Sequence, residues 1–195
     1  MSLIVVGVGC GPGFMTQYGA ECIQQAKRVY GSARAIELAK PFIAPDCEVH
    51  VLQDYSNLDK LPEDAVLLST GDPMLAGLGH LGTEVVPGIS SMQLAFARLR
   101  LPLVKAVVVD GHNSDPSQAI QEAVGEAQRG RIPFILAKPG FDLSLLAKEL
   151  EQHLPCCKIV TCEELGYPKE TITFGTPKAP PKVKSGLFSV LVIRT

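Results

Sequence analysis

Three loops rich in glycine and proline are the part of this sequence best suited to chemistry. The first runs from Gly7 to Gly13, the second from Ser69 to Pro73, and the third from Pro87 to Ser91. Glycine lets a backbone turn tightly and approach a ligand closely, so such loops can hold a small molecule through main-chain groups. The side chains that the loops offer to a ligand are Cys10, Asp72, Ser90 and Ser91.

Each loop directly follows a short apolar run, and a helical pattern comes after it. The runs are Leu3–Val6, Ala65–Leu68 and Glu84–Val86, which we interpret as strands of a buried parallel sheet. In open α/β sheets, ligands bind at the carboxyl ends of the strands. A single loop of this kind is explained by a tight turn between a strand and a helix. Three such loops in succession predict a ligand site that is lined by the backbone of several loops.

The loops do not match the two common nucleotide-binding motifs. A dinucleotide fingerprint counted from Gly7 needs a third glycine where Pro12 stands, and residues 28–32 contain no acidic partner for a ribose. A phosphate-binding loop needs Gly-Lys followed by Ser or Thr, and that triplet does not occur. The sequence therefore argues against a Rossmann dinucleotide site and excludes an ordinary P-loop NTPase.

Bulk composition narrows the function classes further. The chain has 195 residues, 46% of them apolar and 19% charged, and a formal net charge of -2, as in a globular protein with a substantial core. It has no long basic run, so nucleic-acid binding is not expected. It also lacks the roughly 20 apolar residues that span a bilayer and a basic leader with a cleavage site. We therefore expect a cytoplasmic protein without a membrane partner.

Six cysteines are scattered along the chain without a Cys-x-x-Cys pair, and reduced thiols are their expected state. A metal site built from Cys156, Cys157 and Cys162 is disfavoured, because adjacent cysteines point in different directions. In addition, no histidine lies at a typical zinc-ligand spacing from them. We expect no metal site.

Strand and helix patterns alternate through both halves of the chain, which predicts two consecutive α/β domains. We place the first domain at residues 1–101 and the second at 105–195, with a linker at Arg100–Leu103. Asp115 followed by proline and, later, Asp142 are typical helix starts. Other predicted elements are strands at Val49–Leu52, Ala106–Val109, Ile132–Leu136, Ile159–Val160, Thr171–Phe174 and Phe188–Ile193, and helices at Met15–Lys27, Ala33–Lys40 and Ser91–Leu99.

The order and content of the three loops resemble those of the tetrapyrrole methylases. Thr-Gly-Asp-Pro at 70–73, and Pro-Gly-Ile-Ser-Ser at 87–91 before a helix, are typical of that family. The segments Tyr30–Leu38 and Pro87–Leu99 are similar to one branch, the cobalt-precorrin-7 C5-methyltransferases, also found as the N-terminal part of precorrin-6Y C5,15-methyltransferases. The resemblance covers the first half at motif level and the second half only by the order and length of its elements.

The resemblance implies S-adenosyl-L-methionine as cofactor, bound in a cleft between the two α/β domains, and S-adenosyl-L-homocysteine as product. Asp72 would serve the cofactor's ribose or orient its loop, or it is a turn residue whose carboxylate bonds its own backbone. The implied cofactor-binding residues are Cys10, Asp72, Leu75, Ser90, Ser91, Leu136, Ala137, Lys138, Gly186 and Leu187.

The resemblance also implies a corrinoid polycarboxylate as substrate, methylated on C5 in cobalamin biosynthesis. Its acid groups should meet basic side chains, because guanidinium groups pair with carboxylates in bidentate fashion. The basic candidates are Arg34, Arg98 and Lys138, and His112 is a further substrate candidate because it follows a strand. The alternatives are a solvated helix charge for Arg98 and an ordinary loop histidine for His112. The ring carbon is already nucleophilic, so the protein would mainly align it with the methyl group, and no catalytic residue is nominated.

Partners and rival functions follow from the same resemblance. Family members are commonly homodimers, and no fused C15-methylating and decarboxylating domain follows before Thr195, so a separate enzyme is expected for that step. Two alternatives stay open. One is a methylase of the same family that acts on another precorrin carbon or, like diphthine synthase, on a protein. The other is a non-catalytic α/β protein that binds a small ligand.

Overall fold

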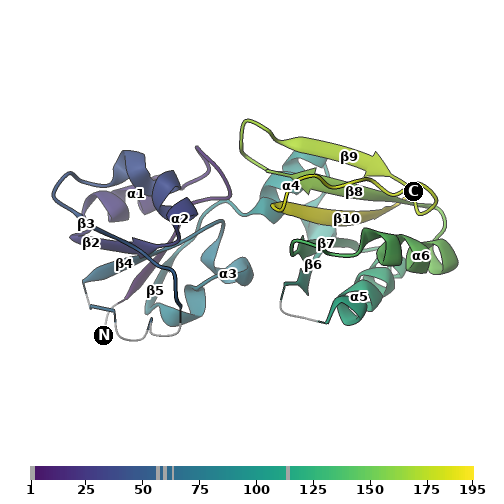
Figure 1. The fold of residues 1–195 in the computed structure, drawn as a ribbon, viewed down its shortest axis with the longest axis horizontal. Coiled ribbons are helices and arrows are strands. Elements are labelled where there is room, and N and C mark those ends of the chain that lie inside the picture. Colours follow the sequence, from purple (N-terminus) through teal and green to yellow (C-terminus); the bar gives the residue numbers. More distant parts are fainter. Residues whose placement is uncertain (1–2, 56–57, 59–60, 63, 113–114) are drawn as a thin grey trace. The chain divides into compact units, whose positions relative to one another are not determined.

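The chain folds into two compact units, Met1–Leu94 and Ala95–Thr195. The computed structural model describes residues 3–55, 58, 61–62, 64–112 and 115–195 (Figure 1). Each unit contains a five-stranded sheet with helices packed on it, so the predicted fold of two consecutive α/β domains is confirmed. By packing, the units divide inside the helix Ser91–Leu99, ahead of the linker suggested at Arg100–Leu103, because the last residues of that helix pack with the second unit.

The sheet of the first unit is entirely parallel. Its strands are β1 (Ile4–Gly7), β2 (Arg28–Gly31), β3 (Glu48–Val51), β4 (Ala65–Ser69) and β5 (Glu84–Val86). They lie in the order β3-β2-β4-β1-β5, and β4 is buried along its whole length, as expected for a strand covered on both faces. Because β4, β1 and β5 are neighbours, the three glycine-rich loops leave the sheet at the same edge.

Side-chain caps start the helices of the first unit. Thr16, Ser32 and Asp72 each accept a hydrogen bond from a backbone N–H two or three residues later, which satisfies a donor that the helix itself leaves unpaired. The elements that these residues start are α1 (Gln17–Gln24), α2 (Ala33–Ala39) and α3 (Pro73–Ala76); α4 (Ser91–Leu99) follows the third loop, and short 3-10 turns are η1 (Lys40–Phe42), η3 (Gly79–Leu81) and η4 (Leu103–Lys105).

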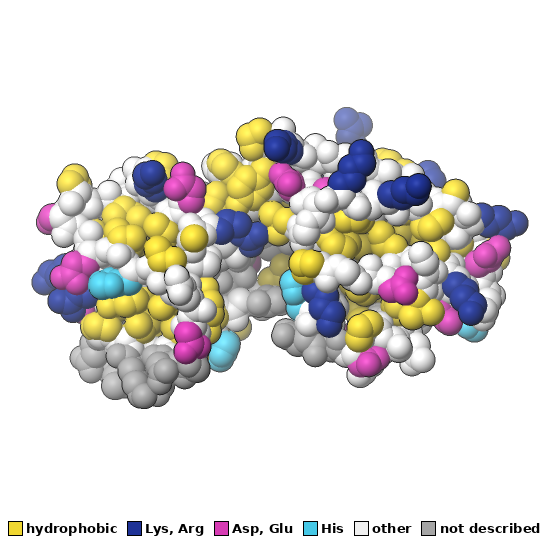
Figure 2. Space-filling model, viewed as in Figure 1, with side chains coloured by type: hydrophobic (Ala, Val, Ile, Leu, Met, Phe, Trp, Pro, Cys, Tyr) yellow, Lys and Arg dark blue, Asp and Glu magenta, His cyan; other side chains and the backbone are white. Residues whose placement is uncertain are grey.

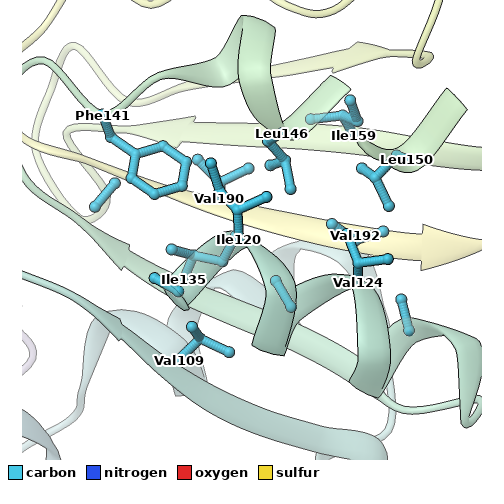
Figure 3. Close-up of a cluster of buried hydrophobic side chains, with 14 of the residues drawn as sticks. Val109, Ile120, Val124, Ile135, Phe141, Leu146, Leu150, Ile159, Val190 and Val192 are labelled. Carbon is cyan, nitrogen blue, oxygen red and sulfur yellow. The ribbon is translucent and has the colours of Figure 1, made fainter. Parts of the chain in front are cut away.

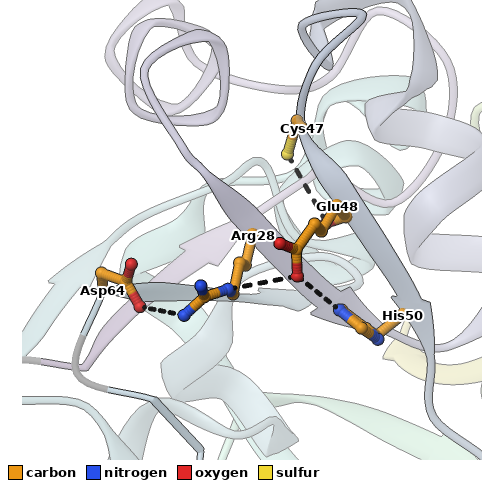
Figure 4. A network of polar contacts seen from close by, with 5 residues as sticks. All are labelled: Arg28, Cys47, Glu48, His50 and Asp64. Carbon is orange, nitrogen blue, oxygen red and sulfur yellow. Dashed lines mark hydrogen bonds and ion pairs between the residues drawn. The ribbon is translucent and has the colours of Figure 1, made fainter.

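The opposite edge of this sheet, where the strands begin, carries a polar network (Figure 4). The Arg28 guanidinium donates to Glu48 at 3.2 Å and to Asp64 at 2.9 Å. His50 Nε2 lies 3.5 Å from the same Glu48 oxygen, and its ring stacks on Tyr30 with 4.5 Å between centroids. Arg28, Glu48 and Asp64 thus join the starts of β2, β3 and β4 at the edge away from the loops. We therefore interpret them as a structural contact and not as part of a ligand site.

The sheet of the second unit is mixed. Its strands are β6 (Ala106–Gly111), β7 (Ile132–Ala137), β8 (Cys157–Glu163), β9 (Thr171–Gly175) and β10 (Phe188–Arg194). They lie in the order β6-β7-β10-β8-β9; β6 and β7 are parallel, whereas β10 is antiparallel to both of its neighbours. The carboxyl ends of β6, β7 and β8 and the start of β10 therefore lie along one edge.

Two helices cover one face of the second sheet and form the larger core with it (Figure 3). These are α5 (Pro116–Gln128) and α6 (Leu143–His153), and their predicted caps Asp115 and Asp142 each accept two backbone N–H bonds. Ile120 of α5 and Leu146 and Leu150 of α6 are fully buried against alternate residues of the strands. Burial of an apolar side chain of this size contributes roughly 1.5–3 kcal/mol, so this face holds the unit together.

The structure corrects two details of the predicted elements. The first helix ends at Gln24, not at Lys27, and Arg28–Gly31, where no strand is predicted, forms β2 in the parallel sheet. The sequence also suggests an edge position or a hairpin for the last two strands. β9 is indeed an edge strand, but Phe188–Ile193 belongs to β10 inside the sheet, where Phe188–Val192 is buried.

Candidate functional site

The three glycine-rich loops are joined by main-chain hydrogen bonds. The Gly9 amide donates to the Gly71 carbonyl at 3.2 Å, and the Gly71 amide donates to the Gly9 carbonyl at 2.8 Å, which joins the first loop to the second. The Cys10 amide donates to the Ile89 carbonyl at 2.9 Å, and the Ile89 amide donates to the Phe14 carbonyl at 3.1 Å, which joins the first loop to the third. The loops therefore form one continuous structure at the carboxyl edge of the sheet.

Glycine is required where these loops cross. A Cβ added to Gly7 would lie 2.5 Å from the amide nitrogen of Gly88 and 2.8 Å from the carbonyl oxygen of Gly71. A Cβ added to Gly88 would lie 2.7 Å from the carbonyl oxygen of Gly7. Since the neighbouring atoms are backbone and cannot rotate away, any larger residue at either position would push the loops apart.

Gly71, in contrast, borders open space. Its φ of +72° is in the left-handed region that favours glycine. Beyond its chain neighbours, an added Cβ would have one described heavy atom within 4 Å, the Cα of Ser90 at 3.9 Å. Cys10 and Ser91 are half-buried in the adjoining loops. This backbone-lined surface between the second and third loops is suited to a small ligand held by main-chain groups.

The Ser90 hydroxyl is used within its own loop. It donates to Gln93 Oε1 at 2.9 Å and accepts from the Gln93 amide at 3.1 Å, while the Ser90 amide donates to the same side-chain oxygen at 2.8 Å. This reciprocal pair is a capping box and fixes the start of α4. The structure thus shows a capping role for Ser90, which is almost completely buried, while a cofactor contact from this residue stays a prediction.

Asp72 and Arg34 both lie at the second loop. One Asp72 oxygen accepts from the Met74 amide at 2.8 Å and caps α3, so the turn role considered for this residue is present. Arg34, on α2, donates from its guanidinium to the Thr70 hydroxyl at 3.0 Å, which places its positive charge beside this loop. Leu75 is half-buried on α3, next to Met74, whose side chain is 66% exposed.

In the second unit, two predicted cofactor segments lie side by side. Leu136 and Ala137 end β7, and Lys138 directly follows it. Ser189 of β10 pairs with Leu136, so the segment before β10 runs alongside the residues after β7. A Cβ added to Gly186 would have Pro139 as its nearest described neighbour, at 3.7 Å, and Leu187 is 37% exposed. Segments that are about fifty residues apart in sequence therefore form one local surface, although their contact with a cofactor stays a prediction.

His112 and Arg98 are the remaining predicted substrate residues. His112 follows β6 at the same edge, and its amide donates to the Asp110 carboxylate at 2.9 Å. Arg98, on α4, donates from Nε to Glu170 at 2.7 Å. Burial disfavours ionisation of Glu170, but the hydrogen bonds from Arg98 and from the Gly166 amide outweigh it, so the pKa of this carboxyl is lowered. Arg98 thus has an internal partner, and its predicted contact with substrate is untested.

Sequence reasoning missed the residues that support the loops. Thr16 caps α1 and also donates its hydroxyl to the Pro87 carbonyl at 3.1 Å, which ties the end of the first loop to the third. Gln93 completes the capping box. The Ser-x-x-Gln spacing at 90–93 is a recognisable signal for that box, whereas no local signal indicates the contact between Thr16 and Pro87.

Two other kinds of site, a metal centre and a membrane span, have no candidate among the described residues. Acidic and basic side chains are interspersed on the face shown in Figure 2. Among the described residues, no three His, Cys, Asp or Glu side chains gather in a group that could hold a metal ion. In the same part of the chain, no helix is long and apolar enough to cross a membrane.

Comparison with known proteins agrees with the geometry. Residues 2–180 match the family model of the tetrapyrrole (corrin/porphyrin) methylases. A curated relative, the decarboxylating precorrin-6Y C(5,15)-methyltransferase of Mycobacterium tuberculosis, is 25% identical over 190 residues, which are 91% of this chain and 47% of the relative. The chain thus spans about half the length of this relative.

Solved structures extend the agreement to the whole chain. A cobalamin biosynthesis precorrin-6Y methylase from Archaeoglobus fulgidus is 30% identical, with a TM-score of 0.77 over 100% of this chain and 98% of that one. The methyltransferase CobJ has a TM-score of 0.80 at 20% identity, over 99% of this chain and 94% of that one, and shows the shared fold. By its family match and its likeness to the Archaeoglobus protein, the chain belongs to the family of tetrapyrrole methylases.

Proposed function

We propose that this chain transfers a methyl group from S-adenosyl-L-methionine to C5 of cobalt-precorrin-7 in cobalamin biosynthesis. The observation that carries the proposal is the joined set of three loops at the carboxyl edge of β4, β1 and β5. Its motifs are those that the sequence shares with C5-methylating enzymes. The 30% identity to a precorrin-6Y methylase over nearly the whole of both chains supports the choice of acceptor.

The residues present fit this cofactor. Gly71 leaves an open, backbone-lined space beside Ser90. One carboxylate oxygen of Asp72 accepts the Met74 amide, and the other oxygen is the one that would contact the ribose. S-adenosylmethionine needs hydrogen-bond partners for its amino acid, ribose and adenine, and glycine-rich loops supply them without bulky side chains. When bound, it supplies a sulfonium methyl group that a carbon nucleophile can accept. In the second unit, the segments that we assign to cofactor binding are Leu136–Lys138 and Gly186–Leu187.

The protein's own contribution to the reaction is to bind and to align. The acceptor carbon of a reduced corrinoid is enamine-like and already nucleophilic, so holding it in line with the methyl group and excluding water would lower most of the barrier. Arg34 carries a positive charge beside the second loop, where it would pair with a carboxylate of the acceptor. His112, which directly follows β6 in the second unit, is the other residue that we assign to the acceptor.

The fold alone does not select the acceptor. CobJ, at 20% identity, superposes slightly better than the precorrin-6Y methylase does, so a different acceptor is compatible with the same fold. Sequence identity and the Pro87–Leu99 motif favour C5 over another precorrin carbon or a protein acceptor. The chain spans about half the length of the Mycobacterium relative, and the C5 step is the part of that relative's named activity that we assign to it.

Cofactor binding is tested by titration calorimetry with S-adenosylmethionine and S-adenosylhomocysteine. We expect micromolar binding. Asp72→Asn keeps an oxygen that can cap α3 but removes the charge, so it should weaken binding about five- to ten-fold at unchanged stability if the carboxylate contacts the ribose. The matched control is Asp115→Asn, since Asp115 caps α5 in the same way. Unchanged affinity in Asp72→Asn would remove Asp72 from the site.

The acceptor is tested by anaerobic incubation of the chain with cobalt-precorrin-7 and methyl-labelled S-adenosylmethionine. We expect one labelled methyl group on C5, located by NMR of the product. Label on another ring carbon, or label on a protein acceptor only, would replace the C5 assignment but leave the methyltransferase class. We also expect a cytoplasmic homodimer, for which sedimentation velocity gives the oligomeric state.

A further inference from the structure

A groove of about 250 Å³ lies in the second unit, at the carboxyl end of β8. Residues of β9 and of the loop before β10 line it together with the end of β8. Its basic lining residues are Lys169, Lys182 and Lys184, and its hydroxyl groups come from Thr171, Thr173 and Ser185. The groove is smaller than the roughly 300–1,000 Å³ pockets that enclose a whole drug-sized ligand, so its size suits part of a larger molecule.

Buried carboxylate bonds hold the shape of this groove. Glu163, which also lines it, is only 6% exposed and accepts the amides of Lys184 and Ser185, both at 2.7 Å. The Ser185 hydroxyl donates to Glu164 at 3.1 Å. These bonds fix the loop before β10 to the end of β8 and use acidic oxygens internally. The two carboxylates therefore act as structural acceptors for the loop that carries Lys182 and Lys184.

The three lysines are available to a ligand. Lys169, Lys182 and Lys184 are all exposed, and within the described part of the chain none of their ammonium groups forms an ion pair. Figure 2 shows Lys and Arg side chains over the part of the second unit that contains β8 and β9. Three ammonium groups that line one groove are suited to a carboxylate or another small oxyanion.

The groove adjoins the segment that we assign to the cofactor. Phe188, the first residue of β10, pairs with Glu163, and Gly186 and Leu187 directly precede it. Neighbouring strands lie about 4.8 Å apart, so the groove begins about one strand spacing from this segment. When the reacting carbon of a tetrapyrrole ring lies next to the methyl donor, the acid side chains at the edge of the ring would extend at least one strand spacing away from the donor. They could therefore reach the groove.

We propose that this groove binds a carboxylate side chain of the tetrapyrrole substrate through Lys182 and Lys184, with Lys169 adding positive charge. The proposal rests on the proposed function, since it needs a polycarboxylate acceptor. It names a substrate subsite distinct from the loops of the first unit. The lysine side chains bind the ligand, whereas Glu163 positions the loop that carries two of them.

The test uses Lys182→Ala/Lys184→Ala, a double variant that keeps the backbone amide of residue 184 and so its bond to Glu163. Lys148→Ala/Lys158→Ala is the matched control, because it removes the same charge from exposed positions on α6 and at the start of β8. The probes are cobyrinic acid, a corrin with free carboxylates, its neutral heptamethyl ester, and pyrophosphate. Binding is followed by corrin absorbance and by calorimetry, with S-adenosylhomocysteine present.

We expect the groove variant to bind cobyrinic acid about five-fold or more weakly than wild type, with S-adenosylhomocysteine affinity unchanged. The control variant should bind like wild type, and the ester should bind equally weakly to all three proteins. Failure of wild type to bind S-adenosylhomocysteine would count against the proposed function, which is a separate result. Three outcomes would overturn the subsite. The groove variant could bind cobyrinic acid within two-fold of wild type, or the control variant could lose as much affinity for cobyrinic acid as the groove variant does. The groove variant could also lose affinity for pyrophosphate while it keeps its affinity for cobyrinic acid.

Discussion

Arg98 Nε donates to one oxygen of Glu170 at 2.7 Å, and the Gly166 amide donates to the other at 2.8 Å. A single carboxylate thus joins α4 to the turn between β8 and β9. The N-terminus of α4 is held by the Ser90 capping box at the third loop. Both ends of this helix are therefore held by specific side-chain hydrogen bonds.

We predict that Glu170→Gln lowers the free energy of unfolding by about 1 kcal/mol at neutral pH. The folded-state pKa of Glu170 is lowered, so its contribution is fully present above the pKa of the unfolded chain. The contribution is lost as the pH falls through the lowered folded-state pKa. Chemical denaturation of both proteins over the acid range should therefore show a stability difference that closes as the pH falls.

Glu151→Gln is the control for this titration, because Glu151 is exposed on α6 and should show no such difference. A gap between Glu170→Gln and wild type that stayed constant down to strongly acid pH would contradict ionisation as its source. Arg98→Lys should recover part of the loss that Arg98→Ala causes, since it restores the charge but not the guanidinium geometry.

We predict that Gly7→Ala and Gly88→Ala each destabilise the chain by roughly 1–3 kcal/mol, because the added Cβ would overlap backbone atoms of the neighbouring loops. The control is Gly125→Ala in α5, where an added Cβ meets no described heavy atom within 4 Å. Since alanine favours a helix more than glycine, that variant should be more stable by about 0.5–1 kcal/mol. Thermal unfolding of the three variants measures the difference, and equal stability of Gly88→Ala and wild type would disprove the close loop contact.

Much of the fold could be predicted because its signals are local. The apolar runs at Ala65–Leu68 and Glu84–Val86 became β4 and β5 with nearly the predicted bounds, and Asp115 and Asp142 cap helices as expected. β2 was missed because Arg28–Gly31 is short and contains a single aliphatic residue, Val29, so it lacks the apolar run that marks the other strands of this sheet. Its pairing with β3 and β4, rather than its own sequence, makes it a strand.

The site could be predicted only in part because its contacts join distant segments. The glycine motifs indicate loops, but no sequence pattern reveals that the Gly7 and Gly88 backbones touch. The position of β10 between β7 and β8 likewise depends on strand pairing, which no local pattern in the sequence reveals. This position brings Gly186 beside Pro139. The bond between Arg98 and Glu170 could not be predicted either, because the two residues are 72 positions apart in the sequence. Sequence reasoning therefore considered only a substrate carboxylate or solvent as the partner of Arg98.

We predict that Gln93→Ala destabilises the chain by about 1 kcal/mol, because two donors of Ser90 lose their acceptor. Gln93→Glu retains that acceptor and should recover the stability. Gln118→Ala is the matched control, since Gln118 occupies the equivalent position of α5 but has no reciprocal bond with the cap residue Asp115. Chemical denaturation compares the three variants, and an equal effect of Gln93→Ala and Gln118→Ala would show that the capping box adds nothing.

We predict that alkylation of the native protein near pH 8 modifies Cys156 and spares Cys157 and Cys162. Cys156 is exposed, whereas both others are buried. Burial raises the pKa of Cys157 to about 11, with a smaller electrostatic contribution from Cys156. Burial likewise raises the pKa of Cys162 to about 12, with a smaller electrostatic contribution from Glu170. Since the thiolate is the reactive form, less than about one part in a thousand of the Cys162 thiol would be reactive near pH 8.

Mass spectrometry of peptides after iodoacetamide treatment measures the labelling at each cysteine. Unfolding in denaturant should make all three thiols react at similar rates, which shows that the protection belongs to the folded state. The two protected thiols lie on opposite faces of β8, with Cys157 in the core under α5 and α6. Rapid native labelling of Cys162 would therefore mean that its face of the second sheet opens to solvent, because its raised pKa depends on burial on that face.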